Sequence, residues 1–292
     1  MNALILRSHE GWHIDRLAEA LAREGICVHK ASISGMTLRA GEGAGLMIED
    51  VDAGKMDLVI VRIIPAGSLD SLLFRMNALR MARALGARIV NSPEAIEKTV
   101  DKAWTSQILA LEGLPTPRTV VCERFEDAMA AFEEMGGAVV KPLTGSCGKG
   151  IMRLCEPDMA YRVFRTMEMN NFIFYLQEYL EADGEDIRIF VTGDKVAAAM
   201  KRKSSGWKAN FHSGAKVSAY EPTGRQADLA IEASRALGLD HAGVDIISTA
   251  DGRDYIVEVN GIPGWKGLQT TTGVDIAQEI VKAALSGYPV QA

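Results

Sequence analysis

Short apolar runs alternate with amphipathic segments through the first hundred residues. Four apolar runs predict strands, at residues 2–8, 26–33, 57–64 and 87–92. Leucines recur at helical spacing in residues 14–25 and 68–86, and Gly25 and Gly86 stand where these helices should end. Strand, helix and strand in this repeated order predict a parallel sheet that is covered by helices.

The pattern changes from about residue 96 onward. Further helices are predicted at residues 93–113, 125–137, 158–170, 225–238 and 273–286. Strands are predicted on both sides of a glycine-rich loop within residues 139–155, and again across residues 172–221 and 242–260. Two prolines in residues 114–123 favour an extended segment at a sheet edge. The chain therefore reads as α/β at its start and α+β in its second half, in three units: 1–95, 96–175 and 176–292.

The composition is typical of a soluble globular protein. The 292 residues carry a net charge of −6 and have a pI near 5.5, so there is no basic excess to bind a nucleic-acid backbone. No apolar run approaches the roughly 20 residues that cross a bilayer, and the first residues predict a strand instead of a signal peptide. The cysteines show no C-x-x-C spacing, which favours reduced thiols in the cytoplasm: Cys27, Cys122, Cys147 and Cys155.

The turn after the first predicted strand reads RSHEGWH, residues 7–13. A dinucleotide-binding unit would carry G-x-G-x-x-G at this place, and the turn lacks it. The N-terminal unit is therefore predicted to be a substrate or scaffold layer.

The stretch KPLTGSCGKGI, residues 141–151, has the glycines and lysines of a phosphate-binding loop. It is not a Walker A loop, because Leu143 and Gly150 occupy the places of the required Gly and Ser or Thr. Strand-like flanks favour a hairpin whose tip lies over phosphates, with Lys141 adding a point charge. On this segment alone, a purely structural glycine-rich turn is an equally good interpretation.

The stretch GVDIISTADGRDYIVEVNGIPG, residues 243–264, predicts a β-hairpin around Asp251 and Gly252. A two-residue loop there places Asp245 opposite Glu258, with Asn260 on the same face. The opposite face should join a core through Val244, Ile246, Val257 and Val259.

Two carboxylates that face each other across a strand pair repel, so either a shared proton or a cation must offset the repulsion. Asp, Glu and Asn supply only oxygen ligands, which suit Mg²⁺ better than zinc. The alternative is a pair of acidic side chains that face solvent and hold no ligand.

Together these segments resemble the ATP-grasp superfamily, and within it the RimK-like amino-acid ligases. The resemblance covers about residues 90–285 and is carried by NSPEAIEKTVDK, VVKPLTGSCGKGI, FYLQEYLEADGEDIRIFV, VAAAMKRK, NFHSGA, AGVDII and VEVNGIPGWKGLQTTTG. It implies an ATP-grasp fold with an N-terminal parallel-sheet domain, a small lid domain and a C-terminal antiparallel-sheet domain. A finer likeness, which includes VRIIPAGSLDSLLFRMNAL, is to the ligases of tetrahydromethanopterin biosynthesis.

The resemblance also implies roles for individual residues. For ATP binding it implies two phosphate-binding lysines, a lid loop, an adenine hinge, an acid and two residues near the nucleotide: Lys102, Lys141, Ser146, Gly148, Gln177, Glu178, Tyr179, Leu180, Asp186, Lys208 and Asn210. For two Mg²⁺ or Mn²⁺ ions it implies the ligands Asp245, Glu258 and Asn260, in agreement with the hairpin. Arg188 and Arg202 match arginines near the substrate and the γ-phosphate, although each could instead be an exposed strand residue in an ion pair.

The activity that follows from this resemblance is an ATP-dependent carboxylate–amine ligation. The acceptor carboxylate would be phosphorylated, and the amine of L-glutamate would attack the resulting acylphosphate. The finer likeness favours a tetrahydromethanopterin-type acceptor. The alternative acceptors are a protein C-terminus and a deazaflavin. The alternative activities are those of a kinase that phosphorylates a hydroxyl group and of a nucleotide-binding module without turnover. Relatives also suggest a homo-oligomer, either a dimer or a tetramer.

Overall fold

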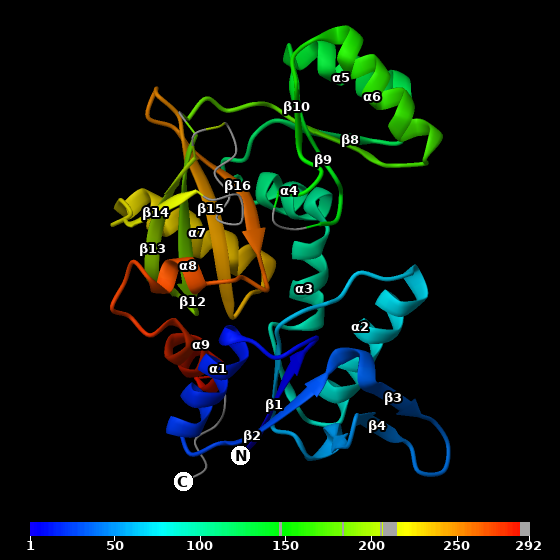
Figure 1. Cartoon of the computed structure of the whole chain (residues 1–292), viewed down its shortest axis with the longest axis vertical. Coiled ribbons are helices and arrows are strands. Elements are labelled where there is room, and N and C mark those ends of the chain that lie inside the picture. Colours follow the sequence, from blue (N-terminus) through cyan, green and yellow to red (C-terminus); the bar gives the residue numbers. More distant parts are fainter. Residues whose placement is uncertain (146–147, 183, 205, 207–214, 287–292) are drawn as a thin grey trace.

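The computed structural model of the protein describes residues 1–145, 148–182, 184–204, 206 and 215–286. Figure 1 shows the N-terminal part at the bottom, residues from the middle of the chain at the top, and a large sheet from the C-terminal part between them. No helix among the described residues is long and apolar enough to cross a membrane. The division of the chain at residues 95 and 175 stays a prediction.

The N-terminal part contains the predicted parallel sheet. Its strands are β1 (Asn2–Arg7), β2 (Cys27–Ser32), β6 (Leu58–Val61) and β7 (Arg88–Val90). They lie in the order β2-β1-β6-β7, and every neighbouring pair is parallel. The helices are α1 (Trp12–Arg23) and α2 (Leu69–Ala84), and the left-handed residues Gly25 and Gly86 follow them as expected.

A small antiparallel sheet in this part was not predicted. It consists of β3 (Met36–Arg39), β4 (Gly45–Ile48) and β5 (Val51–Asp52), with short 3₁₀ turns at Ile33–Gly35 and Ala53–Lys55. None of its strands exceeds four residues, which is too short for a clear alternating pattern. The sheet is held by burial, since Leu46 and Ile48 pack into one core with Leu4 and Leu6.

The helix predicted at residues 93–113 is two helices, α3 (Pro93–Val100) and α4 (Lys102–Leu111). Asp101 separates them in an extended conformation, and its carboxylate accepts hydrogen bonds from the amides of Ala103 and Trp104. An aspartate that caps the second helix therefore interrupts a continuous helical pattern.

The middle of the chain forms an antiparallel sheet with two helices on it (Figure 1). The strands are β8 (Thr119–Cys122), β9 (Ala138–Lys141), β10 (Met152–Leu154) and β11 (Phe174–Gln177), in the order β10-β9-β11-β8. The helices are α5 (Phe125–Met135) and α6 (Pro157–Met169). As predicted, the proline-rich segment leads into an edge strand, and the glycine-rich loop joins two paired strands.

The C-terminal part is a five-stranded antiparallel sheet. Its strands are β12 (Glu185–Thr192), β13 (Lys195–Lys203), β14 (Lys216–Ala219), β15 (His241–Ser248) and β16 (Asp254–Asn260), in the order β14-β13-β12-β15-β16. The helices are α7 (Gly224–Leu237), α8 (Lys266–Gln269) and α9 (Ile276–Leu285). Helix α7 buries Leu229, Ala230 and Ala233 in one core with the apolar face of this sheet.

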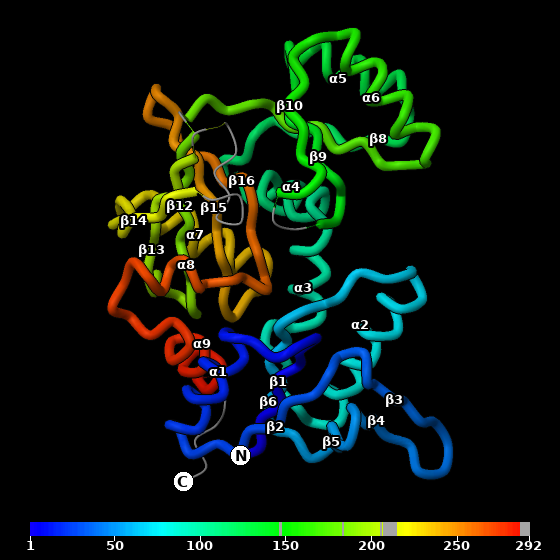
Figure 2. The backbone as a smooth tube through the Cα atoms, in the orientation of Figure 1, coloured from blue at the N-terminus to red at the C-terminus, as the bar shows by residue number. Residues whose placement is uncertain are grey.

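The two ends of the chain share one hydrophobic core. Ile5, Ile14 and Leu17 pack in the same cluster as Trp265 and Ile280. Helices α1 and α9 lie side by side (Figure 2).

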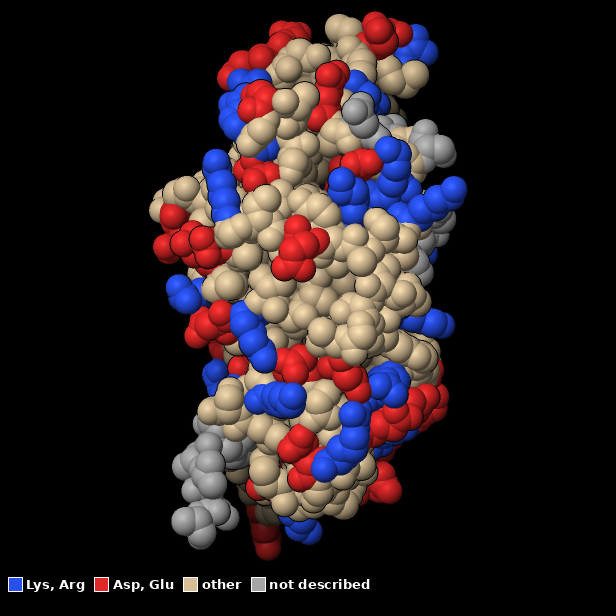
Figure 3. All heavy atoms as spheres, turned by 90° about the vertical axis from the view of Figure 1, so that its left-hand side faces the viewer, with Lys and Arg blue, Asp and Glu red and all other residues tan. Residues whose placement is uncertain are grey.

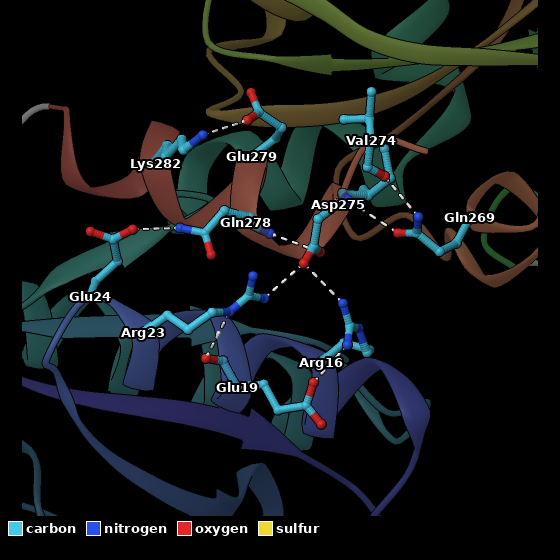
Figure 4. A network of polar contacts seen from close by, with 11 residues as sticks. Arg16, Glu19, Arg23, Glu24, Gln269, Val274, Asp275, Gln278, Glu279 and Lys282 are labelled. Atoms are coloured by element: carbon cyan, nitrogen blue, oxygen red, sulfur yellow. Dashed lines mark hydrogen bonds and ion pairs between the residues drawn. The ribbon is translucent and has the colours of Figure 1, made fainter. Parts of the chain in front are cut away.

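Polar contacts also join α1 to α9. Asp275 at the start of α9 accepts hydrogen bonds from Arg16 at 2.9 Å and Arg23 at 2.7 Å, and Gln278 donates to Glu24 (Figure 4). Figure 3 faces this side of the molecule, and acidic and basic side chains are interspersed over its lower part. The N-terminal part is therefore packed against the C-terminal part through both apolar and polar contacts.

One buried side chain ties the two parts together through the backbone. Asn91 follows β7 and is fully buried. Its amide nitrogen donates to the carbonyl oxygens of His241 at 2.8 Å and Gly261 at 2.6 Å. Its oxygen accepts from the backbone amides of Asp240 at 2.6 Å and His241 at 3.2 Å. Asn91 thus fixes the start of β15 and the turn after β16 on the N-terminal sheet.

We predict that Asn91→Ala lowers the free energy of unfolding by about 3 kcal/mol, because it leaves four buried backbone groups without their partner. Chemical denaturation measures this change. Asn77→Ala, which removes an exposed asparagine from α2, is the control and should change stability by less than about 0.5 kcal/mol. Equal effects of the two substitutions would contradict the role given to Asn91.

Candidate active site

A cleft of about 810 Å³, part of it open to solvent, lies between the middle sheet and the C-terminal sheet. Nine residues singled out from the sequence line it: Lys141, Gln177, Glu178, Tyr179, Leu180, Asp186, Arg202, Asp245 and Glu258. The structure therefore brings most of the predicted site residues together, although they come from strands far apart in the sequence.

The sequence analysis missed the apolar walls of this cleft. Val139, Ile151, Ile247 and Val257 line it beside the polar residues. Apolar side chains on strands look alike whether they face a core or a ligand, so their pattern gave no signal. These walls give the cleft an apolar section that suits a flat ring, next to a charged section.

Lys141 lies at the end of β9, and its amino group donates to the side-chain oxygen of Gln177 at 2.6 Å. Gln177 in turn donates to the hydroxyls of Thr119 and Tyr175. Burial lowers the pKa of Lys141 to about 8, although the nearby charge of Glu258 opposes the shift. The hydrogen-bonded side chain of Gln177 therefore orients Lys141. The resemblance implied only that Gln177 belongs to the adenine hinge.

Lys102, the first residue of α4, joins this helix to the glycine-rich hairpin. Its amino group donates to the carbonyl oxygen of Gly145 at 2.8 Å. Burial lowers its pKa, and the charge of Glu258 opposes the shift. Lys102 and Glu258 also line one small cavity that adjoins the cleft. Lys102 is therefore not an ordinary surface lysine.

The loop between β9 and β10 contains three glycines whose backbone conformation favours glycine. Gly145, Gly148 and Gly150 all have positive φ, a conformation that glycine adopts without strain. Gly148 is not among the described residues that line the cleft. Ser146 and Cys147 lie outside the described residues, as do Lys208 and Asn210.

The segment after β11 has backbone groups that are open to a ligand. Glu178 is held by Arg118, because its amide donates to the carbonyl of Arg118 at 2.9 Å and its carboxylate accepts from the amide of Arg118 at 2.8 Å. Within the described part of the chain, the carbonyl of Glu178 and the amide of Leu180 have no hydrogen-bond partner. A donor and an acceptor two residues apart can pair with the edge of a heteroaromatic ring.

Four charged side chains form a buried network across β12, β13 and β15. Arg188 donates to both oxygens of Asp245, at 2.7 and 2.6 Å, and Arg202 contacts the same carboxylate at 3.0 Å. Arg202 also donates to both oxygens of Asp186, at 2.7 Å from Nη2 and through Nε. Asp245 and Arg202 are each only 3% exposed. These arginines are therefore not the exposed strand residues that the sequence also allowed.

The network controls the protonation of its members. Burial alone would raise the pKa of Asp245, but the charges of Arg188 and Arg202 hold it below its usual value. Burial alone would lower the pKa of Arg202, but Asp245 and Asp186 outweigh it and raise this pKa. The chain thus neutralises Asp245 with two arginines. Part of the expected cationic charge that offsets its repulsion from Glu258 therefore comes from the chain itself, which the sequence did not indicate.

The β15–β16 hairpin has the predicted register at the site and a different one at its turn. Asp245 pairs with Glu258, as expected. Nearer the turn Ser248 pairs with Asp254, one residue out of the predicted register, because the loop holds three residues instead of two. A bulge at Val257 restores the register. Val257 consequently faces the cleft, and its predicted place in the core was wrong.

Oxygen atoms are available at this end of the hairpin for a hard cation. Among the described residues Glu258 has no hydrogen-bond or ion-pair partner for its carboxylate, and Asn260 uses only its amide nitrogen, which donates to the carbonyl of Gly243 at 3.4 Å. The described residues contain no group of three His, Cys, Asp or Glu placed to hold a metal, so Asn260 would have to act as the third ligand. This all-oxygen donor set fits Mg²⁺.

Comparison with known proteins decides the family. The RimK-like ATP-grasp domain model matches residues 99–284, which is more than half of the chain. The chain belongs to the RimK-like ATP-grasp family. This confirms the predicted ATP-grasp fold and the predicted class of enzyme, a ligase. Members of the ATP-grasp ligase class use ATP with magnesium.

Individual relatives agree with this assignment. A tetrahydromethanopterin:alpha-L-glutamate ligase from Methanosarcina acetivorans is 32% identical over 283 residues, 87% of this chain and 85% of that protein. A ribosomal protein bS6–L-glutamate ligase from Salmonella newport is 38% identical over 210 residues, 70% of each chain. The structure of the ATP-grasp ligase PsnB with a minimal precursor, Mg and ADP has a TM-score of 0.74, with 21% identity and 97% of each chain covered.

The lowered pKa of Lys141 predicts that this RimK-like protein binds ATP more weakly as the pH rises from 7.5 to 9.5. The lysine loses its proton near pH 8 in the free site, and its attraction for a phosphate is then lost. We expect affinity to fall by about tenfold, as measured by calorimetric titration with MgATP.

Lys141→Arg should remove this pH dependence, because an arginine stays charged over the whole range. Lys195→Arg, at an exposed lysine paired with Glu279, is the control and should behave like the unaltered protein. The same pH dependence in Lys141→Arg would show that another group titrates.

Proposed function

We propose that this protein is an ATP-dependent ligase that joins L-glutamate to a carboxylate of a tetrahydromethanopterin-type cofactor. The relative from Methanosarcina acetivorans, whose name states this activity, matches 87% of the chain and so reaches into the N-terminal part. The observation that carries the proposal is the cleft itself. An apolar section with open backbone groups lies beside a section with Lys141, Arg202, Asp245 and Glu258.

The site must solve a simple chemical problem. An amine does not displace hydroxide from a carboxylate at neutral pH, so the carboxylate is first phosphorylated by ATP. The glutamate amine then attacks the acylphosphate carbonyl, and the tetrahedral oxyanion collapses to an amide as phosphate leaves. A site for this chemistry needs cations for the triphosphate, donors for the oxyanion and protection from water.

The residues divide these tasks between them. The open backbone groups of Glu178 and Leu180 would bind adenine, and Lys141 and Lys102 would bind phosphate oxygens. Glu258, Asn260 and Asp245 would hold magnesium, whose charge stabilises the phosphoryl group during transfer. We propose two ions, as in the sequence-based expectation.

The two arginines are positioned by the carboxylates that they contact. Arg188 and Arg202 use Nε and Nη2 for these contacts, which leaves the Nη1 group of each without a partner among the described residues. Guanidinium groups fixed in this way keep donors available for the phosphoryl oxygens and the oxyanion without reorganising. Asp186 accordingly orients Arg202 and does not need to contact the nucleotide.

A ligase that acts on a protein tail is the second candidate. The relative from Salmonella newport, named for ribosomal protein bS6, is more similar in the matched region at 38% identity, but it covers only 70% of the chain. Both candidates form an amide with glutamate and differ in the acceptor.

A screen of ATP-dependent phosphate release tests the proposal. L-Glutamate is offered with a tetrahydromethanopterin, a deazaflavin or a glutamate-ending peptide as acceptor. We expect release only with the tetrahydromethanopterin, and a product heavier by one or more glutamyl residues in mass spectrometry. A product that carries phosphate would indicate a kinase, and release with the peptide alone would favour the second candidate.

Glu258→Gln should abolish amide formation while leaving the unfolding temperature unchanged or higher. The substitution removes a proposed metal ligand. The carboxylate has no hydrogen-bond or ion-pair partner among the described residues, and the loss of its attraction for Lys141 and Lys102 is offset by relief of its repulsion from Asp245. Turnover and thermal unfolding are measured on the same sample. Glu168→Gln, at a partly exposed carboxylate on α6 that is paired with Arg165 and does not line the cleft, is the control and should keep its activity. Wild-type turnover by Glu258→Gln would refute the metal assignment.

A further inference from the structure

A second, smaller pocket lies at the carboxyl ends of two neighbouring parallel strands. β1 ends at Arg7 and β6 at Val61, and the amide of Arg62 donates to the carbonyl of Leu6 at 3.0 Å. In this sheet β2 lies beside β1 and β7 lies beside β6, so the chain leaves the pair in opposite directions after β1 and after β6. Parallel sheets bind ligands at such a switch point, where their connections diverge.

The walls of this pocket are rich in hydrogen-bond donors. It has a volume of about 390 Å³, part of it open to solvent, and its lining includes Arg7, His9, Gly11, His13, Arg62 and Ile63. Helix α1 begins here without a side-chain cap. Within the described chain the amides of Trp12 and His13, in its first turn, have no acceptor. Free amides at the start of a helix attract anions.

Arg62 gives independent evidence for an anion. Its Nη2 donates to the carbonyl of Pro263 at 2.8 Å, and its guanidinium lies 4.7 Å from the ring centre of Trp265. The residue is half-buried, but its Nε and Nη1 atoms are buried and have no partner among the described residues. No described carboxylate forms an ion pair with Arg62. Glu10 forms ion pairs with Arg7 and Lys30 instead.

The charge of Arg62 is not compensated by the groups around it. Burial lowers its own pKa to about 10. Burial, followed by the charge of Arg62, lowers the pKa of His13 to about 4 and that of His241 to about 3. His13 is therefore neutral, and because its Nε2 accepts from the amide of Trp265 at 3.1 Å, its proton is on Nδ1. The pocket thus offers donors and an unpaired cation.

The pocket is connected to the active-site cleft through the segment 261–265. Arg62 bonds the carbonyl of Pro263. The side chain of Pro263 packs so closely on Gly243 that a Cβ there would lie 3.0 Å from it, and 3.7 Å from Nε of Arg188. The segment 261–265 would therefore lie between a substrate group in the pocket and Arg188, which contacts Asp245.

We propose that this switch-point pocket binds a non-reacting oxyanion of a substrate, a carboxylate or a phosphate group. The inference rests on the proposed ligase function, because that function makes the anion part of a substrate. The binding of an anion can be tested without turnover. The anion would contact the guanidinium of Arg62 and the first amides of α1. It would fix the substrate while a separate carboxylate reacts in the cleft.

Calorimetric titration of the full-length protein tests the proposal with three probes. N-Acetyl-L-glutamate stands for the end of an acceptor, L-glutamate for the amine substrate, and inorganic phosphate for a phosphate-bearing acceptor. At least one should bind saturably to the unaltered protein. Arg62→Met should weaken that binding by about ten- to a hundredfold, the effect of losing charge-assisted hydrogen bonds. Arg62→Lys should have an intermediate effect, because it keeps the charge without the planar fork.

Arg75→Met is the matched control. Arg75 is also half-buried in the N-terminal part and donates to a proline carbonyl, that of Pro65, at 2.7 Å, but it does not line the pocket. Its substitution should leave probe binding unchanged. The probe that loses affinity in Arg62→Met identifies the source of the anion.

Thermal unfolding separates a binding role from a structural one. Arg62→Met should unfold at about the same temperature, because the loss of the hydrogen bond to Pro263 is offset by the removal of a buried charge without a counter-ion. MgADP should still bind to it in the cleft, so a failed ligase assay would not be mistaken for a failed pocket. The absence of saturable binding by all three probes, or equal binding by Arg62→Met, overturns the proposal.

Discussion

The buried carboxylate of Asp245 is the constraint on which the arrangement of the site depends. A charge that is 3% exposed must be compensated where it lies, and Arg188 and Arg202 do this from two different strands. Because the three residues sit on β15, β12 and β13, their contacts require one register in all three strands. Slipping any strand by one residue would turn a charged side chain into the apolar core beneath the sheet.

The same constraint shapes the chemistry of the cleft. Asp186 accepts from two nitrogen atoms of Arg202, and Asp245 accepts from two nitrogen atoms of Arg188. The guanidinium planes are therefore held before any substrate arrives. Lys141 is oriented in a similar way by Gln177. Glu258 differs, because its carboxylate has no hydrogen-bond or ion-pair partner among the described residues, although the charges of Lys141 and Lys102 act on it. The site therefore combines preorganised cations with one open carboxylate, an arrangement that suits a polyanion bound together with a metal.

Much of this could be predicted from the sequence, and the errors have specific causes. Alternation in the β15–β16 hairpin was enough to place Asp245 opposite Glu258, because a three-residue loop and a bulge at Val257 happen to cancel. Neither irregularity leaves a trace in the pattern, so Val257 was assigned to the wrong face. The break at Asp101 was missed because capping depends on a backbone conformation that periodicity does not report. The arginine partners of Asp245 come from strands more than 40 residues away, beyond any local signal.

The segment 261–265 links the C-terminal sheet to the core that the two chain ends share. Asn91 fixes its first residue through the carbonyl of Gly261, Arg62 holds Pro263, and Trp265 is buried among residues of α1 and α9. Each contact comes from a different element of the N-terminal part. A displacement of that part would therefore be transmitted directly to Asn260, the residue before this segment. Because the proposed metal ligand Asn260 and the proposed anion pocket share this support, the N-terminal sheet would act as more than a scaffold.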